Sequence, residues 1–129
     1  MPERIYDTPL LEKLGVRPGA RVSVLGVRDD TFASQLAKRA DVSARPRRDS
    51  DVIFLAADSA AELARIVELE PLIKRDGAIW VVSRKGKARM IRDVDVIDAG
   101  KRAKLIDNKV VSFSETHSAI RLVVPIARR

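Results

Sequence analysis

Apolar positions along the chain alternate between continuous runs and runs with helical spacing. Continuous runs rich in Val, Ile and Leu predict buried strands. These runs cover residues 21–27, 51–57 and 78–83. Other segments place apolar residues on one face at intervals of three and four, which predicts helices. These segments cover residues 8–14, 29–40 and 59–70.

The first helix and the turn after it have clear end signals. Thr8 is a capping residue, and Pro9 suits the first helical position. Gly15 favours the left-handed conformation that ends many helices. Pro18 and Gly19 then predict a tight turn, with proline at its second position and glycine at its third. The sequence therefore predicts a helix and a turn before the strand at residues 21–27.

The second and third helices also begin at capping residues. Asp29 or Asp30 caps the second helix. Residues 59–62, with the sequence Ser-Ala-Ala-Glu, match a capping box for the third helix. Pro71 kinks or ends this helix, because proline lacks a backbone donor, and residues 72–73 then form a final turn.

The second half of the chain has weaker signals. Residues 76–77, Asp-Gly, predict a turn into the strand at residues 78–83. A helix is predicted from about residue 93 to residue 104, with Gly100 as its weak point. Its apolar side is Val94, Ile97 and Ala103. Two apolar runs around a short polar stretch then predict an antiparallel hairpin. The runs cover residues 110–113 and 120–126, and the polar stretch covers residues 114–118.

Alternating strands and helices followed by a hairpin predict an α/β fold. We expect one Rossmann-like domain over residues 1–129, with helices on both faces of the sheet in three layers. The sheet is mostly parallel, with about six strands and a C-terminal antiparallel hairpin. One of these strands is short and covers residues 41–44.

Composition narrows the chemistry. The chain has 129 residues, of which 46% are apolar and 4% aromatic, so its core is mostly aliphatic. It has no cysteine, which excludes disulfides and cysteine nucleophiles, and one histidine, which excludes a multi-histidine metal site. The start is polar without a signal core, and no apolar run is long enough to span a bilayer. We therefore expect a cytoplasmic protein with no bound metal and no membrane partner.

Three segments carry a resemblance to a known family. Residues 11–26, LEKLGVRPGARVSVLG, resemble the segment that leads into the first strand of class I S-adenosylmethionine-dependent methyltransferases. Residues 51–55 and 72–82 resemble the central strand of that fold and the glycine turn and strand that follow it. The resemblance implies a methyltransferase-like Rossmann fold and S-adenosylmethionine as the cofactor.

The sequence departs from this family where the cofactor binds. Class I enzymes have a glycine-rich loop after the first strand, which lets the backbone approach the cofactor. Residues 26–31 contain one glycine, Gly26. The second strand of the family ends in an acidic residue that binds the ribose, whereas residues 44–45 are Ala-Arg. One strand–helix unit is also missing after Arg45. These departures favour a protein that does not bind the cofactor in the usual mode and is not an enzyme.

A second resemblance is to a family of small uncharacterised bacterial proteins, a domain of unknown function. Residues 9–15, 77–81 and 105–110 carry it. It implies a bacterial protein with a Rossmann-like fold and no established activity, and it carries over no catalytic residues.

Ligands of open parallel sheets bind beyond the carboxyl ends of the strands. Loops at that edge supply the candidate ligand-binding residues Gly26, Arg28, Asp29, Asp58, Ser83, Arg84, Lys85, Lys87 and His117. The alternative is that these are ordinary solvated loops.

His117 is the candidate catalytic residue, a general base oriented by Glu115 or Asp58. The alternative is a polar residue of the hairpin turn.

Charge adds a possible class of partner. Twenty-five Lys and Arg against eighteen Asp and Glu give a net charge of +7. Cations without an intervening acid gather at Arg84, Lys85, Lys87, Arg89 and Arg92, and again at Arg45, Arg47 and Arg48. Such clusters neutralise phosphates, which favours an anionic small molecule or a nucleic acid as the partner. The alternative is a solvated, flexible loop. Asp93, Asp95 and Asp98 are interpreted as acids at a helix start, not as a cation site.

Three hypotheses for the function follow. The one that the sequence favours is a non-catalytic Rossmann-like binding or regulatory module with a basic ligand edge. The alternatives are a minimal S-adenosylmethionine-dependent methyltransferase or other nucleotide-using enzyme, and a basic nucleic-acid-binding protein. An exposed edge strand, at Val42 or in the terminal hairpin, would also allow an oligomer to form.

Overall fold

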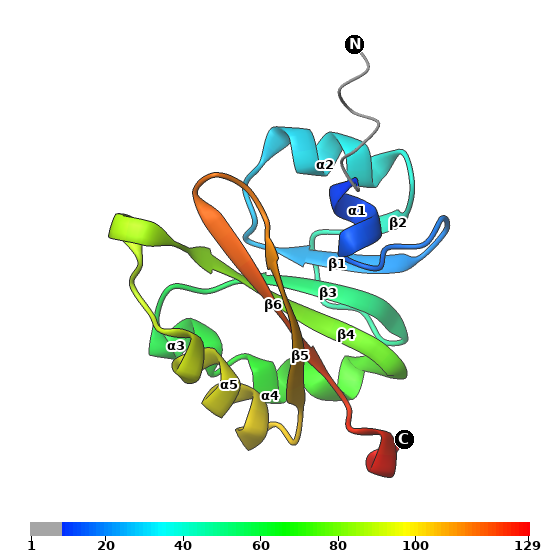
Figure 1. Cartoon of the computed structure of the whole chain (residues 1–129). Helices are drawn as coiled ribbons and strands as arrows, with labels where there is room; N and C mark the ends of the chain where they lie inside the picture. Colours follow the sequence, from blue (N-terminus) through cyan, green and yellow to red (C-terminus); the bar gives the residue numbers. More distant parts are fainter. Residues whose placement is uncertain (1–8) are drawn as a thin grey trace.

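The computed structural model describes residues 9–129, which contain one six-stranded sheet in the order β2-β1-β3-β4-β6-β5 (Figure 1). The strands are β1 (Arg21–Leu25), β2 (Asp41–Ser43), β3 (Ser50–Ala56), β4 (Ile73–Arg84), β5 (Ile106–Ser112) and β6 (His117–Val123). Strands β1 to β4 are parallel, and β6 is antiparallel to both of its neighbours, β4 and β5. The predicted α/β fold, a mostly parallel sheet with a C-terminal antiparallel hairpin, is confirmed.

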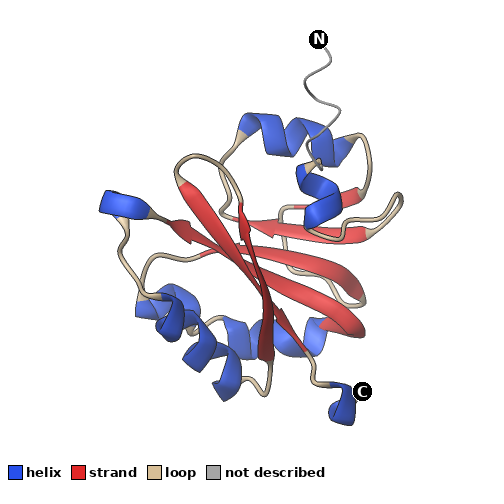
Figure 2. Cartoon of the chain, in the orientation of Figure 1, coloured by secondary structure: helices blue, strands red, loops and turns tan. Residues whose placement is uncertain are grey.

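Helices cover both faces of the sheet (Figures 1 and 2). One face carries α1 (Leu10–Lys13) and α2 (Asp30–Ala37), and the other carries α3 (Ala60–Leu63), α4 (Ile66–Leu69) and α5 (Asp93–Arg102). Short 3-10 turns are η2 (Glu70–Leu72), η3 (Gly86–Ala88) and η4 (Ile126–Arg128). Within residues 9–129, no helix has the length and apolar character needed to cross a membrane.

The core has two halves, because successive residues of a strand point to opposite faces. In β3, Phe54 packs on the side of α1 and α2, and its neighbours Ile53 and Leu55 pack on the other side. Phe32 of α2 contacts Phe54 edge-on, with the ring centres 5.0 Å apart. Trp80 of β4 is fully buried, and its indole Nε1 donates a hydrogen bond of 2.9 Å to the carbonyl oxygen of Leu14. This bond ties the end of α1 to the sheet.

The amino half of β4 differs from the prediction. Leu72 ends the 3-10 turn η2, as predicted for a final turn, but Ile73 already begins the strand, and Gly77 lies inside the strand where its register with β3 shifts. A Cβ on Gly77 would lie 2.8 Å from the carbonyl oxygen of Asp51. The close approach of β3 and β4 therefore requires glycine here.

Helix ends were predicted more accurately than helix faces. Gly15 has a φ of 72°, as predicted, but Pro9 is the cap of α1 and not its first helical residue. Thr8 lies outside the described residues. In α5, Val94 remains 48% exposed, and the helix buries Val96, Ala99 and Gly100 instead. The predicted apolar side is therefore wrong at Val94.

The terminal hairpin is longer and tighter than predicted. Strand β5 begins at Ile106 instead of residue 110, and β6 begins at His117 instead of residue 120. His117 therefore belongs to a strand and not to the turn. The amides of Phe113 and Ser114 both donate to the carbonyl oxygen of His117, at 3.1 Å each, which closes the turn.

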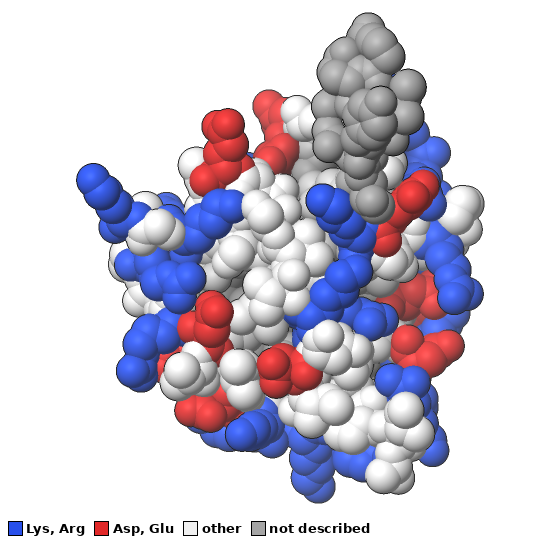
Figure 3. Space-filling model, viewed as in Figure 1, with Lys and Arg blue, Asp and Glu red and all other residues white. Residues whose placement is uncertain are grey.

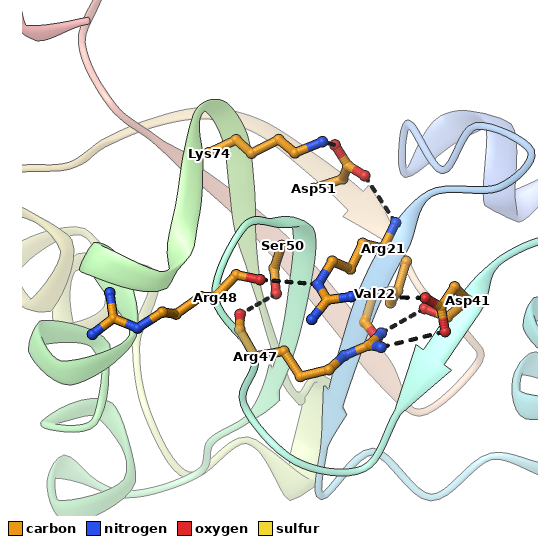
Figure 4. Close-up of polar contacts among 8 residues, drawn as sticks. All are labelled: Arg21, Val22, Asp41, Arg47, Arg48, Ser50, Asp51 and Lys74. Atoms are coloured by element: carbon orange, nitrogen blue, oxygen red, sulfur yellow. Dashed lines mark hydrogen bonds and ion pairs between the residues drawn. The ribbon is translucent and has the colours of Figure 1, made fainter.

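A short loop, residues 44–49, connects β2 to β3 across β1, with no helix or strand between them (Figure 4). Connections between parallel strands usually contain a helix. Here Arg47 holds the loop, because its guanidinium donates hydrogen bonds to the carbonyl oxygens of Val22 and Asp41, at 2.9 and 2.7 Å. The Ser50 hydroxyl donates to the carbonyl oxygen of Arg47 at 2.5 Å. Arg47, interpreted from the sequence as part of a basic cluster, is thus an internal part of the fold.

Candidate functional site

A cleft of about 410 Å³ opens at the carboxyl edge of the sheet. The loops after β1, β3 and β4 and the β5–β6 turn surround it, because parallel strands end at one edge and β6 begins there. Its lining residues are Gly26, Val27, Arg28, Asp29, Ala56, Asp58, Glu62, Val82, Arg84, Phe113, Thr116 and His117. The predicted convergence of these loops is therefore present.

Most of the candidate ligand-binding residues line this cleft, but three do not. Ser83 is buried in β4, opposite Ser118. The Lys85 ammonium donates a hydrogen bond of 2.6 Å to the hydroxyl of Ser112. Lys87 is exposed in η3. Ligand binding by Ser83, Lys85 and Lys87 stays a prediction from sequence alone.

Asp58 is the most firmly held acid of the cleft. Its Oδ1 accepts a hydrogen bond of 2.9 Å from the backbone N–H of Arg84, and its Oδ2 lies 3.8 Å from Arg84 Nε. Glu62 Oε1 accepts hydrogen bonds from the backbone N–H of Asp58, at 2.7 Å, and from the Ser59 hydroxyl, at 3.2 Å. The ends of β3 and β4 and the start of α3 therefore hold the carboxylates of Asp58 and Glu62 in the cleft wall.

The loop after β1 supplies a glycine, a cation and a third carboxylate. Gly26 has a φ of 84°, and a Cβ on it would lie 3.4 Å from the Cβ of Ala56. Asp29 Oδ1 accepts a hydrogen bond of 2.9 Å from the backbone N–H of Phe32, so this residue caps α2 as predicted. Arg28 also lines the cleft. The cleft wall at β1 therefore combines charges of both signs.

His117 has different partners from those predicted. Its Nδ1 lies 2.8 Å from the Thr116 hydroxyl, and its backbone N–H donates a hydrogen bond of 3.1 Å to the Ser114 hydroxyl. In the part of the chain that the structure describes, neither Glu115 nor Asp58 bonds to the ring. Thr116 is the side chain that contacts the imidazole in this structure, and a role for His117 as a general base stays a prediction.

Some lining residues were missed at the sequence level. The capping box placed Glu62 at a helix start close to Asp58 in sequence, which is a usable signal for it. Thr116 belongs to the segment 114–117 that was expected at this edge and to the hydroxyls noted near His117, but its bond to the imidazole was not predicted. Phe113 was assigned to a strand, and no local pattern indicates that its ring reaches the cleft.

Cations gather around η3, at the left of Figure 3. Acids accompany several of them: Arg84 lies 3.8 Å from Asp58, Arg89 lies 3.4 Å from Asp93, and Arg92 lies 3.1 Å from Asp95. The backbone N–H of Arg92 donates to Asp95, and this hydrogen bond together with the Arg92 side chain lowers the pKa of Asp95. Asp95 thus caps α5, as predicted for acids at a helix start.

Among residues 9–129, no group of three or more His, Asp or Glu side chains could hold a metal ion.

Comparison with solved structures identifies the fold class. The chain has the fold of S-adenosylmethionine-dependent methyltransferases, which is the Rossmann-like fold that the sequence resemblance implied. No family model and no curated protein sequence matches the chain.

Three of these structures illustrate the match. A methyltransferase from Aquifex aeolicus has a TM-score of 0.65 and 14% identity, with 97% of this chain and 94% of that chain covered. The pyocyanin biosynthetic protein PhzM has a TM-score of 0.63 and 16% identity, covering 90% of this chain and 53% of its own. Magnesium protoporphyrin IX methyltransferase from Synechocystis PCC 6803, solved with S-adenosylmethionine bound, has a TM-score of 0.58 and 10% identity, covering 90% and 74%. The chain spans about half the length of PhzM.

Proposed function

We propose that the cleft binds S-adenosylmethionine and that the protein is a methyltransferase. The observation that carries this proposal is a cleft at the carboxyl edge of a sheet with the methyltransferase fold. The fold comparisons favour this function over the non-catalytic module that the sequence favoured.

The residues of the cleft suit the chemical groups of this cofactor. Carboxylates accept hydrogen bonds from an ammonium group or from ribose hydroxyls, and Asp58 and Glu62 are held there by backbone donors. The Arg28 guanidinium can pair with the carboxylate of the cofactor. Val82 and Phe113 give the cleft an apolar wall. Strand β2 ends at Ser43 without an acid, so Asp29, Asp58 and Glu62 are the acids available to the ribose. When bound, the cofactor would supply the methyl group of its sulfonium: a nucleophile of the acceptor bonds to the methyl carbon as the carbon–sulfur bond breaks, and S-adenosylhomocysteine leaves with the electron pair.

Calorimetry with S-adenosylmethionine and S-adenosylhomocysteine tests this proposal. We expect both to bind the full chain, and Asp58→Asn to weaken binding by about tenfold, because a charge-assisted hydrogen bond is lost. The matched control is Asp107→Asn, which removes an exposed carboxylate on β5, away from the cleft, and should leave binding unchanged. If neither compound binds at millimolar concentration, the proposal is wrong.

The second candidate is a non-catalytic module for an anionic ligand. It is favoured by the cations Arg28 and Arg84 in the cleft and by the end of β2 without an acid. A thermal-shift screen separates the two candidates, because a ligand of the native state raises the melting midpoint. Stabilisation by ATP but not by S-adenosylmethionine would support this second candidate.

A further inference from the structure

A second cavity, of about 280 Å³, lies at the amino edge of the sheet, opposite to the cleft. It lies among the turn that leads into β1, the start of β3, the amino half of β4 and the middle of β6. Its lining residues are Leu14, Gly15, Arg17, Pro18, Gly19, Ala20, Asp51, Val52, Asp76, Ala78 and Arg121. It shares no lining residue with the cleft, and the proposed function does not use it.

Arg121 is the unusual residue of this cavity. It lies on β6, between Trp80 of β4 and Lys109 of β5, and its side chain is partly buried. No residue in the described range 9–129 gives its guanidinium a hydrogen-bond acceptor or an ion-pair partner. Burial lowers the pKa of Arg121, and the neighbouring Arg129 cation adds to this effect. A partly buried cation is usually paired, so the Arg121 guanidinium is a donor group without a partner in the described lining of the cavity.

Within residues 9–129, the two acids of the cavity form no ion pair with Arg121. Asp51 Oδ2 accepts a hydrogen bond of 2.8 Å from the backbone N–H of Arg21, and its Oδ1 lies 2.9 Å from the Lys74 ammonium (Figure 4). Asp51 is therefore already matched by two donors, and the nearby Arg17 cation also lowers its pKa. Asp76 is exposed on the amino half of β4, and Arg17 supplies a second guanidinium to the lining.

We propose that this cavity binds the oxyanion of a small molecule, a carboxylate or a phosphate group, through Arg121 and Arg17. Guanidinium groups bind both kinds of oxyanion through paired N–H donors. The volume of about 280 Å³ suits a small molecule and not a polymer. The site lies on the opposite edge from the cleft, so it does not depend on the methyltransferase proposal.

Titration of the full chain with sodium phosphate, and separately with sodium acetate, tests the site. Ionic strength is kept constant with sodium chloride, and the backbone amide resonances of Gly15, Gly19 and Ala20 are followed by NMR. We expect saturable shifts at these amides, and affinity about fivefold lower in Arg121→Gln. The matched control is Arg48→Gln, which removes an exposed cation from a loop outside the lining.

The two probes separate the sources of the oxyanion. Saturation by phosphate alone supports a phosphorylated ligand, and saturation by acetate supports a carboxylate ligand. No saturable shift with either probe, or equal shifts in Arg121→Gln and the wild type, would overturn the proposal. If Arg121→Gln fails to fold by circular dichroism, Arg17→Gln makes the same test from a loop. A failure of S-adenosylmethionine to bind the cleft leaves these outcomes unchanged.

Discussion

Ser23 is fully buried in β1, and its hydroxyl has no hydrogen-bond partner among residues 9–129. An unsatisfied buried polar group costs about 1–3 kcal/mol. We therefore expect Ser23→Ala to raise the free energy of unfolding by about 1 kcal/mol in urea denaturation followed by circular dichroism. Ser50 is a matched control, since it is equally buried but its hydroxyl donates to the carbonyl oxygen of Arg47. Ser50→Ala should lower stability, and equal effects of the two changes would contradict the prediction.

The carboxylate of Asp51 predicts a pH dependence. Burial alone would raise the pKa of Asp51, but the hydrogen bond from Arg21 N–H and the Lys74 ammonium outweigh it and lower the pKa below 3.8. A lowered pKa in the folded state contributes stability above the unfolded value, and this contribution is lost as pH falls through the folded value. At pH 7 we expect Asp51→Asn to cost about 1 kcal/mol, since the ion pair is partly exposed.

The same Asp51→Asn comparison, repeated at decreasing pH, checks the sign. The stability difference from the wild type should shrink below pH 3.8, where the unfolded carboxyl becomes protonated. Asp107→Asn is the control, because this exposed acid should change stability by less than about 0.5 kcal/mol. A difference that is constant from pH 7 to pH 3 would contradict the assignment to Asp51 ionisation.

Residues with local signals were predictable, and residues with distant partners were not. Asp29 and Gly15 were predicted as helix ends, because capping depends on the next few residues. The contacts of Arg47 with Val22 were not predictable, since they form only when β1 and β2 lie side by side. The same reason applies to Arg121: its partial burial between β4 and β5, without a partner among residues 9–129, depends on how these strands pair with β6.

At the scale of elements, Gly100 shows how packing overrides helix propensity. A Cβ on this residue of α5 would lie 3.0 Å from Leu122 Cδ2, and Leu122 is fully buried in β6. Alanine gains about 1 kcal/mol in helix propensity, but overpacking a rigid core costs about 1–3 kcal/mol. We expect Gly100→Ala to lower the free energy of unfolding by about 1 kcal/mol in urea denaturation.

A second substitution tests this cause. Leu122→Val shortens the opposing side chain, so the double variant Gly100→Ala, Leu122→Val should be more stable than the sum of the single effects predicts. Purely additive effects would show that α5 moves to accommodate the methyl group and that contact with Leu122 is not limiting.

Strands buried on both faces were predictable from sequence, whereas edge strands and irregular strands were not. The apolar runs at β3 and the carboxyl half of β4 are continuous, as both faces are covered. The amino half of β4 is exposed at residues 74–76, so only pairing with β3 makes it a strand. Strand β5 is exposed at all positions but Val111, which explains why only its end was predicted.

At the scale of the molecule, the location of the cleft was predictable because it depends on topology alone. The carboxyl ends of β1, β3 and β4 meet at one edge in any sheet of this order. Its internal contacts were not predictable. The bond between His117 and Thr116 and the hydrogen bond from Arg84 to Asp58 depend on where each strand ends.

The net charge of +7 gives a prediction for the whole surface. Around η3, the arginines Arg84, Arg89 and Arg92 lie close to acids, which offset their charge. Lys85 and Lys87 should therefore contribute most to the attraction of a polyanion. In fluorescence anisotropy, we expect the triple variant Arg84→Gln, Lys85→Gln, Lys87→Gln to bind single-stranded DNA about fivefold more weakly, with a smaller salt slope. The control has the same charge change at Lys38, Arg65 and Lys101, which are exposed elsewhere. Equal binding by both triple variants would remove the support for nucleic-acid binding at η3.

The indole of Trp80 connects parts of the chain that are distant in sequence. It is the only tryptophan of the protein, it is fully buried in β4, and its N–H is bound to Leu14 at the end of α1. Its emission spectrum therefore reports whether α1 is seated on the sheet, while far-ultraviolet circular dichroism reports the backbone as a whole. The protein thus contains a natural optical probe for detachment of its first described helix, with no label required.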